Sequence, residues 1–539
     1  MYEIKPDTMN YRVLIAEIEK GDIKIPQFQR EFVWTIDQAA KLLDSIIKNY
    51  PIGTFIFWQT KEKLRCIRDL GDLNIPPTEE GNYTKYVLDG QQRLTSLYVS
   101  IKGEKIKQKG QITDFGKLYV NLDANESKDE PIVITDISNL NEDSIVKFTD
   151  LLAGRGDLYN KYKKYSTLID LYKDNFNYYS FSVIKVKDAP IDIATEIFTR
   201  INIGGKPLSV FEIMCAKIFD DKRNFDLAEK SKEVCIELSE MNYEIPPIKI
   251  LQAVAICMVK DCDKTHILKK LDKDKFIDIW DEVVDAFKKS VDYFRNTYRI
   301  KVSQLLPYDS LLIPFTYFFF KHQDKPLGTM QVLLQDFFWR VALTKRYQSS
   351  LESKIAQDIK AIDLILKEET PKYDTPVDIT TDFILNNGTF NIGSSFIKAL
   401  LCVLAYQEPK SFADDSVVTI DNSCLKQSNS KNYHHFFPKA FLKKQNIEEW
   451  KINNIVNITI VDDYLNKRQI RDKAPSVYIQ EFIKINPNIE KTLATHLIGE
   501  PEECGILEDD YDKFINSRLK KFNDELKKRL ILTEKDRYK

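Results

Sequence analysis

Apolar positions in the first 200 residues switch repeatedly between helical and strand spacing. Thr35 and Gln38 form a capping box, and apolar residues at helical spacing follow, which predicts a helix that begins after Thr35. Residues 54–58 (Thr-Phe-Ile-Phe-Trp) predict a buried strand, and the alternating residues 177–186 predict a strand that returns to the same sheet. Residues 190–200 then predict a helix. Residues 103–131 predict a hairpin insertion between these elements.

A polar turn joins a strand to a helix in this region. The strand is expected to end at Leu88 and the helix to begin near Arg93, so Asp89-Gly90-Gln91-Gln92-Arg93 forms the turn. Free N–H groups at a helix start attract phosphate, Gly90 permits close approach, and Arg93 can bind phosphate through two hydrogen bonds. Asp89 would repel phosphate unless a metal or a water lies between them. An ordinary polar turn with Asp89 as the helix cap fits the residues equally well.

Residues 209–369 have helical periodicity throughout, and the stretch from Leu333 to Leu366 is either one long helix or two shorter ones. Aromatic and basic residues mix at 338–340 and 345–347. They predict either a DNA-facing surface or, as the favoured interpretation, an aromatic core with a basic rim. Residues 370–390 contain two prolines and several Asp and Thr residues, which predicts a linker before a helix at 394–407.

The C-terminal third contains the adjacent pair His434 and His435, two of only five histidines in the chain. They lie on a short aromatic strand that Pro438 ends, and the β-branched residues 454–461 predict a second strand or extended loop. Asp462 and Asp463 can cap a following helix. Neighbouring strand residues point to opposite faces, so the two imidazoles are expected to have different roles. A packed aromatic strand is the alternative to a catalytic pair.

Composition narrows the class of protein. The chain has 539 residues, which favours about three domains, and its net charge of −2 gives no global attraction for nucleic acid. DNA contact would therefore need a local basic patch, and the positions around the histidine pair supply one: Lys439, Lys467, Arg468 and Arg471. The helix expected at 518–530 either adds positive charge or has a merely solvated face. No signal sequence, spanning segment or paired cysteine motif is present in the sequence, which predicts a cytoplasmic protein without a membrane partner.

Three motifs in order resemble one family. Ile-Pro-Gln-Phe-Gln-Arg-Glu-Phe-Val-Trp at 25–34, Asp-Gly-Gln-Gln-Arg at 89–93 and Phe-Thr-Arg-Ile-Asn at 198–202 look like the N-terminal domain of GmrSD-type restriction enzymes. That resemblance implies a modification-dependent (type IV) restriction enzyme with a ParB/sulfiredoxin-like, nucleotide-hydrolysing α/β domain. It also implies a nucleotide pocket lined by Gln29, Arg30, Asp89, Gly90, Gln91, Gln92, Arg93, Arg200 and Asn202. No Walker A motif occurs, so a P-loop enzyme is excluded.

The histidine segment resembles the ββα-metal (HNH or His-Me finger) nucleases, on His434, His435, Pro438, Asn457 and Asn466. By that resemblance His435 is the general base, His434 and Asn466 hold one divalent metal, and Asn457 orients His435 or braces the loop. His434 stands where many relatives carry Asp, which leaves the choice among Mg²⁺, Mn²⁺ and Ni²⁺ open.

Together these observations predict an α+β multidomain protein. The expected domains are a ParB-like nucleotide-binding domain at 1–208, a helical middle at 209–369, and an HNH-like nuclease within a mostly helical domain at 370–539. The predicted function is a nucleotide-regulated, metal-dependent DNA endonuclease of anti-phage defence that cuts modified phage or plasmid DNA and binds a nucleotide triphosphate. The alternatives are a phosphorothioate-sensing DNA-nicking protein and a regulatory DNA- or nucleotide-binding protein with an inactive nuclease fold. The sequence leaves the oligomeric state open, a homo-oligomer included.

Overall fold

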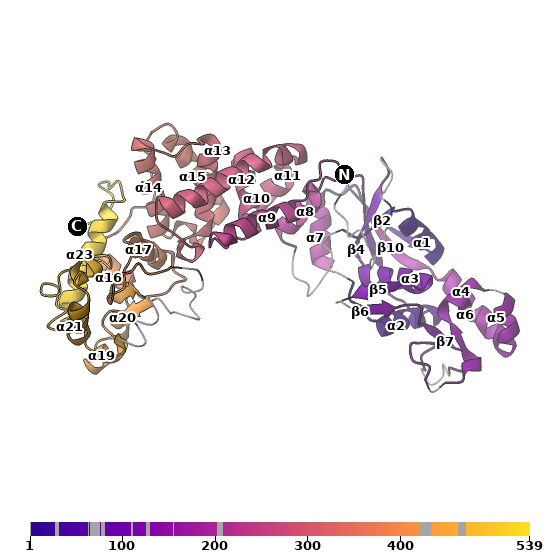
Figure 1. Ribbon diagram of the computed structural model, residues 1–539. Coiled ribbons are helices and arrows are strands. Elements are labelled where there is room, and N and C mark those ends of the chain that lie inside the picture. Colours follow the sequence, from indigo (N-terminus) through magenta and orange to yellow (C-terminus); the bar gives the residue numbers. More distant parts are fainter. Residues whose placement is uncertain are drawn as a thin grey trace. The chain divides into compact units, whose positions relative to one another are not determined.

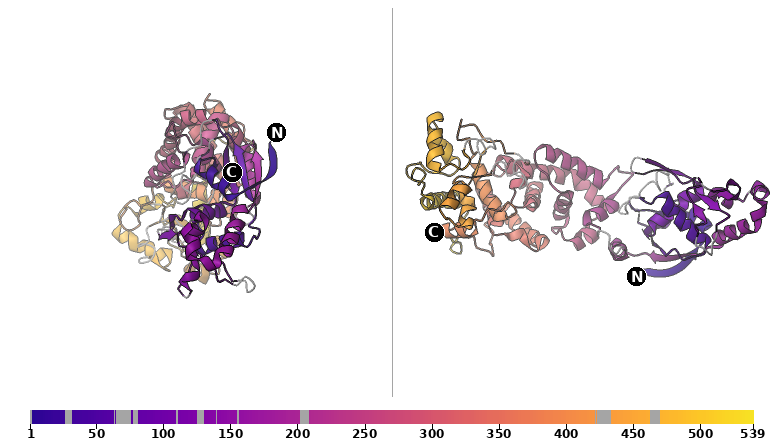
Figure 2. Two further views of the ribbon diagram at one scale, coloured as in Figure 1. Left: turned by 90° about the vertical axis from the view of Figure 1, so that its right-hand side faces the viewer. Right: turned by 90° about the horizontal axis from the view of Figure 1, so that it is seen from below.

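The computed structural model divides the chain into two compact units, Met1–Leu227 and Ala228–Lys539, which are described separately (Figures 1 and 2). The structure describes residues 2–26, 32–62, 64, 76, 81–108, 111–124, 130–138, 140–154, 156–201, 208–420, 422, 433–461 and 470–539. Within these ranges, none of the helices has the length and apolar character needed to cross a membrane.

The first unit is built on a five-stranded mixed sheet with the order β1-β10-β3-β4-β2. Its strands are β1 (Glu3–Met9), β2 (Ile23–Lys24), β3 (Phe55–Thr60), β4 (Thr84–Asp89) and β10 (Phe181–Lys187). β10 pairs parallel to β3 and antiparallel to β1, which confirms that the alternating segment near residue 181 returns to the first sheet. β3 pairs antiparallel to β4, and β4 parallel to β2.

Alternation along the strands gives the sheet two apolar faces. Phe55 and Phe57 belong to one core cluster, together with buried residues of α1 (Tyr11–Glu19), α2 (Ile36–Ile47), α3 (Gln91–Lys102) and α6 (Ser166–Tyr178). Trp58 points to the opposite face, where its ring packs on Tyr86 and its indole N–H donates to the Ala189 carbonyl at 2.9 Å. α7 (Ile191–Ile201) begins just after Ala189 and packs against β4. Helices therefore cover both faces of the sheet.

Two local features predicted from the sequence, a capping box and a hairpin, are present in the structure at the predicted positions. The Thr35 side chain accepts from the Gln38 N–H, and the reciprocal bond completes the capping box that starts α2. The insertion contains the predicted hairpin, β5 (Lys105–Gln108) and β6 (Gln111–Asp114). The remaining elements of this unit are β7 (Tyr119–Asn121), β8 (Val133–Ile134), β9 (Ile145–Lys147), α4 (Phe148–Ala153), α5 (Gly156–Lys161) and α8 (Val210–Ile218).

The second unit is almost entirely helical, in agreement with the helical periodicity of residues 209–369. Its first helices are α9 (Leu227–Glu240), α10 (Pro247–Val259), α11 (Lys264–Lys270), α12 (Lys273–Asn296), α13 (Leu312–Lys321), α14 (Gly328–Leu343) and α15 (Leu351–Ile365). Its later elements are α16 (Thr381–Asn387), α17 (Ser395–Tyr406), β11 (Tyr433–His435), α19 (Lys439–Lys444), α20 (Glu449–Ile452), β12 (Ile458–Ile460), α21 (Pro475–Ile485), α22 (Ile489–Ala494) and α23 (Tyr511–Lys527). Leu333–Leu366 thus forms parts of two helices rather than one.

Burial decides the open alternatives in this unit. Phe338, Trp339 and Tyr347 are buried, so the aromatic and basic mixture is a core, as favoured, and the alternative of a DNA-facing surface is wrong. Arg518 is also buried and donates to the His496 and Val456 carbonyls, so it adds no charge to the surface. Both outcomes have the same cause: a long side chain can be desolvated when backbone carbonyls or carboxylates accept its hydrogen bonds.

The expectation of a linker at residues 370–390 is wrong. The segment contains α16, its apolar residues Val377, Ile379 and Ile384 are buried, and the Ile379 N–H donates to the Arg537 carbonyl at 2.8 Å. The Arg537 N–H in turn donates to the Val377 carbonyl at 2.9 Å. This stretch therefore pairs with the C-terminal tail instead of separating two domains.

Candidate functional site

The histidine pair lies on β11, which pairs antiparallel with β12. His434 is opposite Thr459 and His435 is opposite Ile458. Pro438 follows the strand and precedes α19, and residues 455–457 form a single 3₁₀ turn before β12. Both predicted strands are present, and the structure shows that they pair with each other. The helix expected after Asp463 lies outside the described residues, as do Asn466, Lys467 and Arg468.

His435 is held through one ring nitrogen. Its Nε2 lies 3.1 Å from Asn453 Oδ1, and the Asn453 Nδ2 donates to the Phe390 carbonyl at 3.4 Å. Because the amide oxygen can only accept, His435 carries its proton on Nε2 and leaves the lone pair of Nδ1 available. Burial and the nearby charge of Lys439 lower the pKa of His435 to about 4. The side chain is thus a neutral imidazole near pH 7, with one fixed tautomer.

His434 is almost completely buried, with 3% of its surface exposed. Its Nδ1 is enclosed and has no hydrogen-bond partner among the described residues. Burial lowers its pKa to about 3, with smaller contributions from His435 and His496. A buried polar atom without a partner is uncommon in folded proteins, and a neutral imidazole nitrogen is a common metal ligand. His434 therefore has the protonation state that a ligand requires.

Asn457 holds the loop after β11. Its Oδ1 accepts from the Phe437 N–H at 2.9 Å, and its Nδ2 donates to the carbonyls of Phe437 and Ile452 at 3.0 and 3.1 Å. The backbone carbonyl of Asn457 also accepts from the Phe436 N–H. Of the two roles that the resemblance implies, these contacts correspond to bracing the loop, whereas the orienting contact to His435 comes from Asn453.

Two residues near the histidine pair had no distinct signal in the sequence. Asn453 stands in an Asn-rich stretch where several amides compete for the same role. His496, 62 residues after His434, is buried against the Phe412 ring and bonds the Lys410 carbonyl through Nε2 at 2.7 Å. Burial lowers the pKa of His496 to about 3 as well. Three neutral histidines therefore cluster around β11, although only two are adjacent in the sequence.

The polar turn of the first unit is organised around Arg93. Its guanidinium donates to Asp89 at 2.9 Å and to the carbonyls of Ile52 and Thr54 at 2.6 and 3.0 Å. Gly90 has φ +91°, and a Cβ there would meet the Phe55 ring at 2.5 Å. A Cβ on Gly53 would meet the Arg93 guanidinium at 2.4 Å. Two glycines thus make the space in which Arg93 fixes the turn, and a phosphate contact would require Arg93 to exchange some of these bonds.

The other residues of the predicted nucleotide pocket make fewer contacts with the turn at residues 89–93, or lie outside the described residues. Gln91 and Gln92 are buried at the start of α3, and Gln92 Oε1 accepts from the Val33 N–H at 2.9 Å, which ties the turn to the end of the first motif. Arg200 lies at the end of α7 with 79% of its side chain exposed, paired with Glu196. Gln29, Arg30 and Asn202 lie outside the described residues. The structure therefore brings together residues 89–93 and leaves the rest of the predicted pocket untested.

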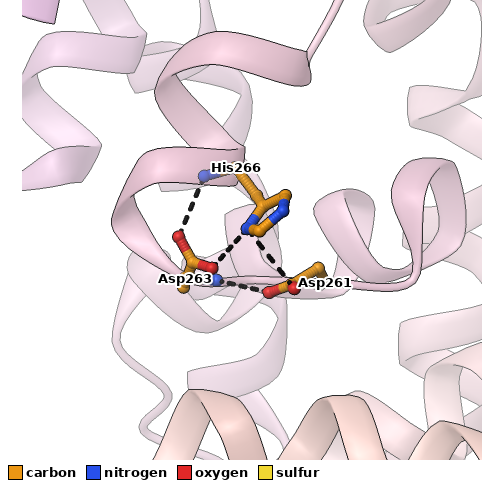
Figure 3. A group of neighbouring side chains, drawn as sticks. All are labelled: Asp261, Asp263 and His266. Carbon is orange, nitrogen blue, oxygen red and sulfur yellow. Dashed lines mark hydrogen bonds and ion pairs between the residues drawn. The ribbon is translucent and has the colours of Figure 1, made fainter.

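A second set of metal-ligating side chain types lies far from both sites in the sequence, at Asp261, Asp263 and His266 (Figure 3). Asp263 caps α11 by accepting from the His266 N–H at 2.9 Å, and both carboxylates lie beside His266 Nδ1. Asp261 accepts from the Asp263 N–H at 3.0 Å. Helix capping and these internal hydrogen bonds account for the arrangement without an ion.

Comparison with known proteins gives a direct match to the first unit. Residues 11–219 match the family model of the GmrSD restriction endonuclease N-terminal domain. The match contains the sheet strands β2, β3, β4 and β10 and the turn at residues 89–93, and it ends before the second unit begins. An uncharacterized protein of Methanocaldococcus jannaschii is 24% identical over 98% of both chains. The similarity to the GmrSD family is thus limited to residues 11–219, which lie within the first unit.

Proposed function

We propose that the chain is a metal-dependent DNA endonuclease of anti-phage defence, regulated by a nucleotide in its first unit and directed against modified DNA. The observation that supports it most is the neutral His435, which Asn453 fixes in one tautomer. It follows His434 in the chain, and the buried Nδ1 of His434 has no hydrogen-bond partner among the described residues. The GmrSD match of residues 11–219 supports the restriction role independently of that geometry.

The proposed chemistry assigns His435 as general base. Its Nδ1 accepts a proton from the attacking water, and the new positive charge is stabilised by the Nε2–H bond to Asn453. The lowered pKa keeps the side chain in the neutral form near pH 7 and makes it a weaker base than a free imidazole. Asn457 keeps the loop after β11 in place by its bonds to Phe437.

The side chains around β11 fit a divalent metal. The enclosed Nδ1 of His434 has no partner among the described residues, and its lowered pKa leaves the imidazole neutral, which is the form that binds a metal ion. His434 and Asn466 would hold the ion. A bound metal supplies Lewis-acid stabilisation of charge on the scissile phosphate.

Metal preference follows from the replacement of a carboxylate by imidazole. A neutral nitrogen ligand disfavours Mg²⁺ and raises the relative affinity for Mn²⁺ or Ni²⁺, so we expect more plasmid nicking with these ions at equal concentration. His434→Asp should shift the preference toward Mg²⁺. The measurement is a metal titration of nicking at one pH, combined with the metal-induced shift of thermal unfolding for both proteins. Identical metal profiles would show that His434 is not a ligand.

The nucleotide role rests on the turn at residues 89–93. We expect Asp89→Ala and Arg93→Ala to lower nucleotide hydrolysis about 10²-fold or more, because each removes a charged group from the proposed pocket. The nuclease chemistry of the second unit should remain. Hydrolysis of the four common NTPs is measured, with Arg93→Lys as the control that keeps the charge. Hydrolysis at the wild-type rate by both alanine variants would place the pocket elsewhere.

The decisive experiment for the whole proposal is cleavage of matched modified and unmodified phage DNA, with and without nucleotide and metal. Cleavage of modified DNA alone supports the proposal. Selective nicking of phosphorothioate DNA would favour a backbone-sensing relative instead. Absence of metal-dependent cutting under every condition would favour a regulatory binding protein, the third alternative.

A further inference from the structure

A basic surface with an exposed aromatic ring adjoins the histidine pair. It consists of residues 439–453, which form α19, α20 and the loop between them, and the two short helices lie side by side (Figure 1). We call it the α19–α20 surface. It contains four lysines and two glutamates, which gives it a net charge of +2 in a chain whose net charge is −2. A local excess of positive charge attracts a polyanion.

Two of the four lysines are available to bind phosphate. Lys443 pairs with Glu449 at 3.2 Å and so links the two helices, and the Lys444 ammonium lies 4.0 Å from an exposed carboxylate of Asp472. Lys439 and Lys451, by contrast, pair with no carboxylate in the part of the chain that the structure describes. Their ammonium groups can therefore contact phosphates without first breaking an ion pair.

The exposed ring belongs to Trp450 on α20. The other tryptophans of the second unit, Trp280 and Trp339, are buried, whereas 38% of Trp450 is exposed. Its Nε1–H donates to Glu448 at 2.9 Å, and the Lys451 ammonium lies 5.7 Å from the centre of the ring. No aromatic ring among the described residues packs on it. An indole held by its polar edge, with an open ring surface beside a lysine, is suited to stack on a nucleic-acid base.

Both helices of this surface are joined directly to His435. α20 is followed at once by Asn453, whose Oδ1 lies 3.1 Å from His435 Nε2 and whose N–H donates to the Glu449 carbonyl at 2.9 Å. α19 begins at Lys439, directly after Pro438, and the charge of Lys439 adds to the effect of burial in lowering the pKa of His435. A DNA strand whose phosphate reaches His435 therefore passes along the α19–α20 surface.

We propose that the α19–α20 surface binds DNA at a base that has left the helix stack, with Trp450 stacked on that base and Lys439 and Lys451 on neighbouring phosphates. This inference rests on the proposed nuclease role of His435 and adds a preference for locally distorted DNA. Opening an intact base step costs free energy that an unpaired base does not require. A duplex with a one-base bulge should therefore bind more tightly than the matched duplex.

The test is a fluorescence-anisotropy titration of the full chain with bulged and matched duplexes, without metal. Trp450→Ala should weaken binding of the bulged duplex about 10-fold, whereas Trp450→Phe keeps a ring and should stay within about 3-fold of the wild type. Ile485→Ala, at an exposed apolar position of α21, is the matched control and should bind like the wild type. DNA should quench the tryptophan fluorescence of the wild type more than that of Trp450→Phe.

Salt dependence tests the lysines separately from the ring. Lys439→Ala and Lys451→Ala should each reduce the slope of log affinity against log salt concentration by about 1, because each removes one phosphate contact. Trp450→Ala should leave that slope unchanged, because stacking releases no counterions. A merely structural role of these residues would not produce this division.

Binding is measured without cutting, so this inference and the nuclease proposal can fail separately. Binding of the bulged duplex through Trp450 by a wild type that never cuts DNA would support the surface and refute the nuclease. Wild-type binding and cutting by Trp450→Ala, with thermal unfolding unchanged, would refute the surface alone. Equal affinity of the wild type for the bulged and matched duplexes, or no binding of either, also overturns the inference.

Discussion

His435→Ala is expected to lower DNA cleavage about 10²–10⁴-fold, the usual loss when a general base is removed. The physical reason is that His435 is the histidine of β11 whose ring is fixed by an amide and keeps a free lone pair on Nδ1. Folding and nucleotide binding should persist, because the ring makes its hydrogen bond to Asn453 alone among the described residues. Plasmid nicking by the purified variant measures the effect, and His322→Ala serves as a matched histidine control in the same unit.

The pH profile separates a catalytic role from a structural one. With a pKa of about 4, His435 stays neutral down to that region, so cleavage should persist through pH 6 and fall only as the pH approaches 4. Asn453→Ala removes the bond that fixes the tautomer and should lower the cleavage rate while leaving nucleotide hydrolysis unchanged. Wild-type cutting by His435→Ala would refute the assignment outright.

Arg340→Ala is expected to destabilise the second unit by about 3–5 kcal/mol, because it leaves buried carboxylates without their partner. Arg340 donates through Nε to both oxygens of Asp336 and through Nη1 and Nη2 to Asp536 at 3.1 and 2.9 Å. Nη2 also donates to the Ile531 carbonyl at 2.6 Å. All three side chains in this network are buried. Chemical denaturation followed by circular dichroism measures the loss.

The control for this prediction is Lys289→Ala. Lys289 pairs with Asp285 at 2.8 Å across one turn of α12, but 34% and 63% of the two side chains are exposed, and solvent-exposed pairs of this kind contribute at most about 1 kcal/mol. A loss of stability for Arg340→Ala no larger than that of Lys289→Ala would contradict the view that the network holds the C-terminal tail.

Elements that depend on residues close together in the sequence were predicted correctly. The capping box at Thr35 depends on residues three apart, and the alternation near residue 181 depends on immediate neighbours, so both could be found in the sequence. The segment at 370–390 could not. Its prolines and polar residues are typical of a linker, whereas its structure depends on pairing with Arg537, more than 150 residues later. Arg340 is similar, because a basic residue in an aromatic stretch gives no sign that Asp536 is its partner.

The candidate site likewise has some features that local sequence predicts and others that depend on distant parts of the chain. The short strand at His434 and His435 and the second strand near Ile458 follow from local residue types, whereas their pairing is known only from the structure. Which amide holds His435 does not follow, because Asn453, Asn454 and Asn457 are chemically alike and only the path of the chain selects among them. The role of Arg93 as a structural clamp likewise depends on the carbonyls of Ile52 and Thr54, which a motif cannot specify.

The Arg340 network also bears on how this chain can be inherited and recombined. It joins α14 to the tail at Asp536, and Asp536 accepts from the Val377 N–H at 2.8 Å, so three distant stretches share one buried cluster of charge. A crossover near residue 370 would pair α14 of one parent with the tail of another and leave a charged group without its partner unless both parents carried the same triad. Between parents that differ in this triad, the helices that precede residue 370 and the segment from residue 370 to the C-terminal tail would therefore have to be exchanged as a single block.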